Sequence, residues 1–197
     1  MEFGVARRVV HSKATRERIL AAVERTVKRY GYEGIGVDGI AKVAGVTSGA
    51  FYAHFPSKSA AFQEAVGASL RELRDSILRL QQEQPERWLK SFIDSYVGER
   101  RRCDLADACA LQALTADVMR AGDEVRDAFQ EELIGVIDAV AAGLPAKQGE
   151  ESIARAWALL TLLSGGVTTA RAIPDQDLAE QAADAVRSAA LALAYST

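Results

Sequence analysis

The stretch DGIAKVAGVTSGAFYAHFPSK, residues 38–58, decides the fold of this chain of 197 residues. Two short helices that cross at a tight turn need a small residue at the crossing and a turn residue that tolerates a positive φ. Ala41 and Gly45 stand at these two places. Thr47 can cap the second of these helices, and Pro56 ends it. The stretch therefore predicts a helix-turn-helix.

A third helix, over residues 15–30, is expected to complete this unit. Its apolar residues Ile19, Val23 and Val27 recur every four residues, which places them on one face. That face can form a small core with the apolar residues of the quoted stretch, namely Ile40, Val43, Val46, Phe51 and Phe55. Residues 1–57 are thus predicted to be an N-terminal arm followed by a three-helix domain.

The rest of the chain shows helical periodicity nearly throughout, and no convincing alternating strand pattern is present. Its composition, 49% hydrophobic and 26% charged, is ordinary for a soluble globular protein. We predict an all-α fold of about nine helices, in which residues 58–197 form a helical bundle. The expected helices span 15–30, 38–44, 47–55, 57–84, 86–101, 107–120, 123–142, 149–172 and 175–195.

Helical geometry predicts what the third short helix presents to the outside. If Phe51 and Phe55 face inward, Gly49 and Ala53 point outward, and this face is small and almost uncharged. It can therefore approach a DNA groove closely, with hydroxyl and imidazole groups that donate to phosphates or base edges. His54 can instead be a packing histidine, and both interpretations stay open. The expected DNA contacts of arm and head are Arg7, Arg8, Lys13, Val37, Thr47, Ser48, Gly49, Ala50, Tyr52, Ala53, His54 and Lys58.

The distribution of charge agrees with this interpretation. Residues 1–62 carry ten basic and five acidic side chains, a net charge of +5, whereas the remainder carries 14 and 22, a net charge of −8. A basic head on an acidic body is expected if only the head meets a polyanion. Residues 7–13, RRVVHSK, are expected to be a flexible arm that contacts the DNA backbone or minor groove, or else a solvated tail.

These residues resemble the TetR-type family of bacterial transcription regulators. The matching pattern comprises Arg16-Glu17-Arg18-Ile19-Leu20, Tyr30-Gly31-Tyr32, Ile40-Ala41, Ala44-Gly45-Val46, Gly49, Phe51-Tyr52, His54-Phe55 and Ser57-Lys58. The resemblance implies an all-helical homodimer with two DNA-binding heads, a ligand-binding body, and a dimer interface made by the last two helices. It also implies a ligand-responsive repressor on a palindromic operator. Two positions depart from the family pattern: Gly36 replaces the usual hydroxyl residue before the second helix, and Ser59 replaces the usual acid.

The body is expected to bind a small effector. Its helices carry aromatic and apolar residues at helical spacing with only a few hydroxyl groups, which suits an apolar or aromatic ligand better than a strongly ionic one. Each of these residues can equally be ordinary core. The candidate ligand-binding residues are Trp88, Phe92, Tyr96, Cys109, Leu114, Phe129, Leu133, Trp157, Thr161 and Ser164.

The last two helices carry matching stripes of small and apolar residues, which predict pairing with a second copy of the chain. The expected interface residues are Ala158, Leu162, Gly165, Ala182, Val186, Ala189 and Leu193.

Cys109 is open to two interpretations. Asp107 can cap the following helix and place Cys109 in its first turn, near Arg100, Arg101 and Arg102, where a thiolate is favoured. The surrounding residues resemble a branch of the family in which some members sense oxidants or electrophiles with a cysteine. The other interpretation is a small buried residue at a helix junction.

Several functions are not expected. The two histidines are dispersed, and no carboxylate pair, metal-ligand spacing or Gly-rich phosphate loop is present, so we predict no catalytic residues, no metal and no cofactor. A helical small-molecule-binding protein without DNA function is a further alternative, which the basic head argues against.

The longest uncharged apolar stretch, 156–170, is short for a bilayer, and no secretory signal is visible, so the expected location is the cytoplasm.

Overall fold

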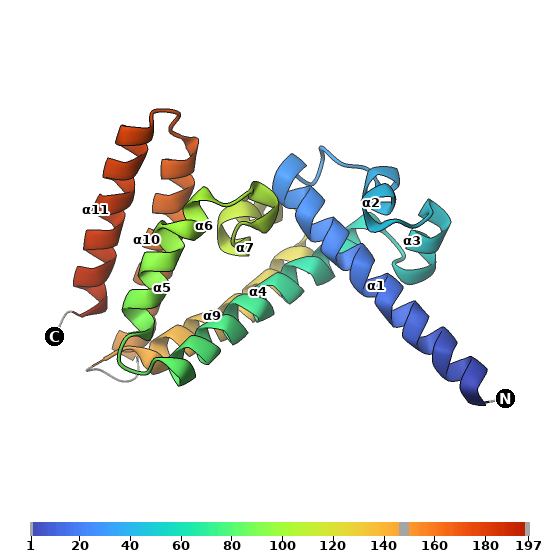
Figure 1. The fold of residues 1–197 in the computed structure, drawn as a ribbon, viewed down its shortest axis with the longest axis horizontal. Helices are drawn as coiled ribbons and strands as arrows, with labels where there is room; N and C mark the ends of the chain where they lie inside the picture. Colours follow the sequence, from blue (N-terminus) through green and yellow to red (C-terminus); the bar gives the residue numbers. More distant parts are fainter. Residues whose placement is uncertain (1, 146–149, 196–197) are drawn as a thin grey trace.

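The computed structural model describes residues 2–145 and 150–195, with side chains from Ser12 onward, and this part of the chain is entirely helical (Figure 1). The prediction of an all-α fold is confirmed. The N-terminal head consists of α1 (Glu2–Tyr30), α2 (Val37–Ala44) and α3 (Ser48–His54). The body consists of α4 (Lys58–Glu83), α5 (Trp88–Val97), α6 (Glu99–Arg102), the 3-10 turn η1 (Leu105–Asp107), α7 (Ala110–Ala113), α8 (Thr115–Arg120), α9 (Asp123–Gly143), α10 (Glu150–Ala172) and α11 (Gln176–Ala194).

Two of the expected helices are each divided in the structure. The segment 86–101 breaks at Gly98, whose ψ of −93° is not helical, and gives α5 and α6. The segment 107–120 becomes η1, α7 and α8, with a break between α7 and α8 at Leu114. The expected number of about nine helical segments is otherwise correct.

The long helix α4 forms the central support of the molecule. It runs beside α9 along the body, and its first turns also pack against α1 of the head (Figure 1). Its buried face includes Phe62, Val66, Leu70, Leu73 and Ile77, which recur every three or four residues along the helix. These residues join the core of the head to the core of the body in one continuous hydrophobic cluster.

Two arginines of α10, the buried Arg155 and the half-buried Arg171, bind carbonyl groups at the ends of neighbouring body helices. Arg155 of α10 donates to the carbonyl oxygens of Ala194, at 2.7 Å, and Pro145, at 3.0 Å. Arg171, at the other end of α10, donates to the carbonyl oxygens of Arg100, at 2.9 Å, and Cys103, at 2.8 Å. Guanidinium groups are well suited to these places because helix C-termini leave carbonyl groups unpaired and carry partial negative charge.

Helix α10 is long and apolar enough to cross a membrane, by length and composition alone. In the structure it contacts α11, α9, α7, α6 and α5, and eight of its 23 residues are buried.

The contact between α10 and α11 depends on a glycine. A Cβ atom at Gly166 would lie 2.3 Å from Cγ2 and 2.8 Å from Cγ1 of Val186, far inside normal contact. The neighbouring Gly165 has open space around the same position. Val186, which the sequence places at a dimer interface, is therefore packed within its own chain. The sequence could not reveal this because both contacts call for the same small and apolar residues.

We predict that Gly166→Ala lowers the free energy of unfolding by about 1–3 kcal/mol, because the added methyl group must displace Val186. Gly135→Ala, within α9, is the matched control, because a Cβ there lies no nearer than 3.4 Å to the flexible Arg74 side chain. It should leave stability unchanged or raise it by up to about 1 kcal/mol, since alanine favours helix. Urea unfolding followed by circular dichroism measures both. Equal stability of the two variants would contradict this packing.

Candidate nucleic-acid interface

The turn between α2 and α3 has the geometry that its sequence predicts. Gly45 ends α2 with a φ of +66°, the left-handed region in which glycine is favoured. The N–H group of Val46 then donates to the carbonyl oxygen of Ala41 at 2.9 Å, which turns the chain back towards α3. No other atom lies near a Cβ built at Gly45, so backbone conformation, not space, requires glycine here.

Two hydroxyl groups organise the start of α3. The Thr47 hydroxyl oxygen accepts the N–H group of Ala50 at 3.1 Å, the N-cap expected from the sequence. The Ser48 hydroxyl donates to Asp38 of α2 at 2.5 Å. Ser48 was expected to contact DNA, but its proton is used to join the two helices, whereas the proton of Thr47 is free for an external acceptor.

The two faces of α3 are divided as predicted. Phe51 is fully buried and Phe55 is 2% exposed, and both lie in the core of the head. Tyr52 is 56% exposed, and its neighbour Ala53 is exposed as well. The remaining residues expected at this surface are Thr47 and Gly49, which are exposed, and Val37, Ser48, Ala50, His54 and Lys58, which are half-buried.

His54, the last residue of α3, faces the junction between head and body. It lines a cleft of about 420 Å³ together with Arg16, Glu64, Arg71 and residues of α9. Arg16 donates to both carboxylate oxygens of Glu64 and lies over the ring of Phe55, 4.7 Å from its centroid. His54 therefore borders an ion pair that joins α1 to α4. The sequence had left open whether His54 contacts DNA or packs within the protein.

Lys58 holds the loop between α1 and α2 in place. Its ammonium group donates to the carbonyl oxygens of Tyr32, at 2.8 Å, and Ile35, at 3.2 Å, and lies 3.9 Å from the ring centroid of Tyr32. An ammonium group has three N–H donors, so one is left for a phosphate. Lys58 was expected to contact DNA, and in the structure it also holds the loop between α1 and α2.

The structure corrects the expectation that residues 7–13 form a flexible arm. The backbone over 7–13 belongs to α1, which already begins at Glu2, since no proline interrupts the segment and Arg, Lys and Ala favour helix. The side chains of Arg7 and Arg8 lie outside the described part of the structure. Lys13 is exposed and lies 4.0 Å from Glu17 one turn later.

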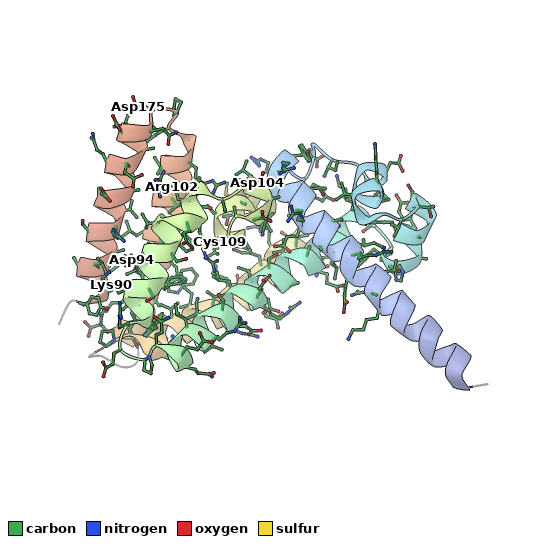
Figure 2. All side chains as sticks on the ribbon, viewed as in Figure 1. Lys90, Asp94, Arg102, Asp104, Cys109 and Asp175 are labelled. Atoms are coloured by element: carbon green, nitrogen blue, oxygen red, sulfur yellow. The ribbon has the colours of Figure 1, made fainter. Side chains whose placement is uncertain are left out.

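The C-terminal end of α1 is linked to the body by polar contacts. Arg25 pairs with Asp107, and Arg29 pairs with Asp104, each at 2.6 Å. Asp104 lies beside the end of α1 and also caps η1 through the N–H group of Ala106 (Figure 2). The hydrogen bond from Arg29, followed by that from Ala106, lowers the pKa of Asp104, which keeps this carboxylate ionised near neutral pH.

A third link joins α8 to the loop after α1. The Asp117 carboxylate accepts the backbone N–H group of Tyr32 at 2.9 Å. The sequence did not reveal that Asp104, Asp107 and Asp117 contact the head. For Asp104 and Asp107 the only signal was the complementary charge of Arg25 and Arg29, four residues apart on α1, and this does not identify a partner 75 to 82 residues away. For Asp117, which accepts a backbone N–H group 85 residues away, there was no signal.

The residues expected to bind a ligand lie in two places. Five are buried in the interior: Trp88, Phe92, Tyr96, Cys109 and Leu114. Three others, Phe129, Leu133 and Trp157, line a groove on the surface of α8, α9 and α10. The candidate residues therefore do not line one common pocket. Periodicity identifies an apolar face but not the helix, or the solvent, that this face meets.

The buried group is tightly packed. The rings of Trp88, Phe92 and Tyr96 follow one another along α5 with centroid separations of 6.5 and 5.6 Å. Burial, and then the neighbouring Cys109 thiol, raises the pKa of Tyr96, so its hydroxyl remains protonated. On α10 the Ser164 hydroxyl donates to the carbonyl oxygen of Leu111 at 3.0 Å, and Thr161 is exposed.

The surroundings of Cys109 differ from those expected. Asp107 does not cap the next helix, because it is the last residue of η1 and pairs with Arg25; Cys109 itself is the residue before α7. Cys109, labelled in Figure 2, is 7% exposed. It borders a small cavity of about 120 Å³ whose charged lining residues are Lys28, Arg100, Glu24, Glu72 and Asp107. Arg101 and Arg102 instead bind Glu180 of α11.

The residues expected at a dimer interface lie on α10 and α11. Ala158, Gly165 and Ala189 are exposed, whereas Leu162, Ala182, Val186 and Leu193 are half-buried. Within residues 2–145 and 150–195, no cluster of three or more His, Cys, Asp or Glu side chains could hold a metal ion.

Together these features define a class of protein, the helix-turn-helix DNA-binding proteins with a helical body. Residues 19–65 match the family model for bacterial regulatory proteins, tetR family. The structure of reduced NemR from E. coli is 22% identical, with a TM-score of 0.73, 88% of this chain covered and 96% of that chain. A TetR-family regulator from Agrobacterium tumefaciens is 19% identical, with a TM-score of 0.73 and coverages of 90% and 98%.

A third similar structure is the regulator FadR from Bacillus subtilis in complex with stearoyl-CoA, at 18% identity and a TM-score of 0.65, with 91% of this chain and 97% of that chain covered. No curated protein sequence is significantly similar to the chain. At these identities the solved structures establish the fold, and the family model identifies the head. The N-terminal head is therefore that of the TetR family of transcriptional regulators, which are DNA-binding transcription factors and not enzymes, and the whole chain shares the fold of such regulators.

Proposed function

We propose that this DNA-binding regulator is a ligand-responsive repressor that acts as a homodimer on a palindromic operator. The observation that carries the proposal is the link between α1 and the loops of the body at Asp104, Asp107 and Asp117. These contacts join α1, and the loop after it, to η1 and α8 of the body. A movement of η1 or α8 can therefore change the position of the head. We also propose that residues 1–57 and 58–197 act as the two functional units, and that the protein works in the cytoplasm.

In this proposal α3 enters the major groove. Tyr52 and Thr47 donate to phosphates or base edges, while Gly49, Ala50 and Ala53 allow close approach and contact thymine methyl groups. Lys13, Arg7, Arg8 and the remaining N–H donor of Lys58 are assigned to phosphates. Ser48 and Val37 support the surface, and His54 lies at its edge. A surface with so few charged base readers depends strongly on phosphate contacts, so its affinity should fall steeply with salt.

The dimer is assigned to the outer faces of α10 and α11. Exposed small residues such as Ala158, Gly165 and Ala189 allow helices from two copies to approach closely. Two heads then reach successive major grooves when they lie roughly 34 Å apart, and a ligand that favours another spacing releases the DNA.

The effector remains an apolar or aromatic small molecule in this proposal. The aromatic interior along α5 and the apolar groove on α9 and α10 both support that chemistry. The FadR structure that resembles this fold holds stearoyl-CoA, which has a long apolar chain.

A second candidate function is thiol sensing at Cys109. The observation in its favour is the small cavity of about 120 Å³ that this residue borders, which leaves room beside the sulfur for an oxidant or an added group. The cavity also borders Asp107, which pairs with Arg25 of α1, so a larger group on the sulfur would disturb the link to the head.

We predict that Tyr52→Phe weakens binding to DNA from upstream of the gene by about three- to tenfold, the equivalent of one lost hydrogen bond to DNA. The unfolding temperature should not change, because this side chain is 56% exposed. Tyr30→Phe, on an equally exposed tyrosine at the end of α1, is the matched control. Fluorescence anisotropy measures affinity. Unchanged binding by the Tyr52 variant would remove that residue from the interface.

We expect Ala158→Glu to turn the dimer into a monomer, because two carboxylates would be buried between closely packed helices. Operator affinity should then fall by at least about tenfold, since one head alone loses the gain from joint binding to two half-sites. Sedimentation velocity measures the mass. Ala142→Glu, which alters an exposed residue of α9, should remain dimeric. A dimeric Ala158 variant would place the interface elsewhere.

If Cys109 is a sensor, hydrogen peroxide should oxidise its thiol to a sulfenic acid, with peroxide reduced to water, and release the DNA. Cys109→Ser should then abolish this release, whereas Cys103→Ser, at the half-buried second cysteine, should retain it. A mobility-shift titration with peroxide compares the two. Equal release in both variants would dismiss the thiol mechanism and leave the ligand-responsive one.

A further inference from the structure

The surface groove between α8, α9 and α10 has a volume of about 580 Å³. Its lining is mainly apolar and comes from three helices: Val118 and Met119 on α8, Phe129, Leu133 and Ile134 on α9, and Trp157 on α10. Met119 is 72% exposed, Ile134 48% and Trp157 40%. Single exposed apolar residues are ordinary, but a contiguous group of them in a hollow indicates a binding surface.

The charges at one end of the groove decide what kind of molecule it suits. Asp123, Arg126 and Asp127 lie there at the start of α9. Arg126 pairs with Asp123 at 3.2 Å, so these two charges offset one another. Asp127 makes no ion pair or hydrogen bond with the described residues, and it leaves the end of the groove with one uncompensated negative charge.

The aromatic and sulfur-containing lining favours the same kind of ligand. The faces of tryptophan and phenylalanine rings attract cations, most strongly when the cation carries little bound water. Methionine adapts its shape to flat or irregular apolar groups. A groove with Trp157, Phe129 and Met119 beside one free carboxylate therefore complements a molecule with an apolar body and a positive charge.

We propose that this groove binds a hydrophobic organic cation, whose apolar groups lie on Phe129, Ile134 and Trp157 and whose charge faces Asp127. The proposal goes beyond the expected apolar or aromatic effector because it adds a charge of defined sign. It rests on the proposed ligand-responsive function only for its effect on DNA, since binding itself can be measured without DNA.

The position of the groove connects it to the head. Helix α8 is only six residues long, and Thr115, Val118 and Met119 line the groove. The same short helix carries Asp117, which accepts the N–H group of Tyr32 at 2.9 Å. A ligand that presses on α8 thus acts on an element that directly holds the loop between α1 and α2.

The test compares two ions of nearly equal size and shape but opposite charge, tetraphenylphosphonium and tetraphenylborate. Isothermal titration calorimetry of the full-length protein should give at least about tenfold tighter binding of the cation. Asp127→Asn should weaken cation binding by about two- to fivefold, the effect of a partly exposed charge pair, and Trp157→Ala by about fivefold or more. Asp138→Asn, at another exposed acid of α9, should change nothing. Unfolding temperatures check that each variant is folded.

Equal affinity for the two ions, or stronger binding of the anion, would overturn the assignment. A change of mass in sedimentation velocity on substitution of Trp157, without loss of cation binding, would also overturn it, because the groove would then be covered by a second copy of the chain. The effect on DNA is measured separately by anisotropy. If the cation binds with the expected dependence on Asp127 but does not release DNA, the groove assignment stands and ligand-responsive repression through it fails.

Discussion

The apolar face of α1 is shared between the two parts of the molecule. Ile19, Val23 and Val27 are buried in the cluster that also contains Phe51 and Phe62, so α1 packs against the recognition helix and the first turns of α4 together. The opposite side of its last turns bears Arg25 and Arg29, which bind the loop between α6 and α7. The position of α3 relative to the body therefore depends on how α1 is held.

The two kinds of contact made by α1 differ in strength. Each fully buried aliphatic side chain contributes about 1.5–3 kcal/mol, so the hydrophobic contacts keep the head folded and attached. An exposed ion pair contributes much less, because water and salt screen its charges. The pairs of Arg25 and Arg29 are partly exposed, as their 43–52% accessible arginine side chains indicate. They can break and re-form at small cost, which suits a link that must respond to a ligand without unfolding the head.

The short helices between α6 and α9 are the part of the body best placed to transmit such a response. Breaks that include those at Gly98 and Leu114 divide this region into elements of three to six residues, which have few internal hydrogen bonds to resist movement. Cys109 borders their inner side, the apolar groove lies on their outer side, and Asp117 joins them to the loop after Tyr32. A thiol modification or a bound cation would thus act on the same segment between α6 and α9.

The sequence by itself determined the all-α fold, the helix-turn-helix, the inward side of Phe51 and Phe55, and the cap at Thr47. These features depend on periodicity and turn chemistry within about twenty residues, and such local rules are readable along the chain. Only the tertiary structure decided that Ser48 and Lys58 use donors to hold the head together, that Val186 packs on Gly166, and that the expected ligand residues lie in two places. Which face of one helix meets which face of another depends on residues far apart in the sequence, and apolar patterns are the same for a core, a groove and a dimer interface.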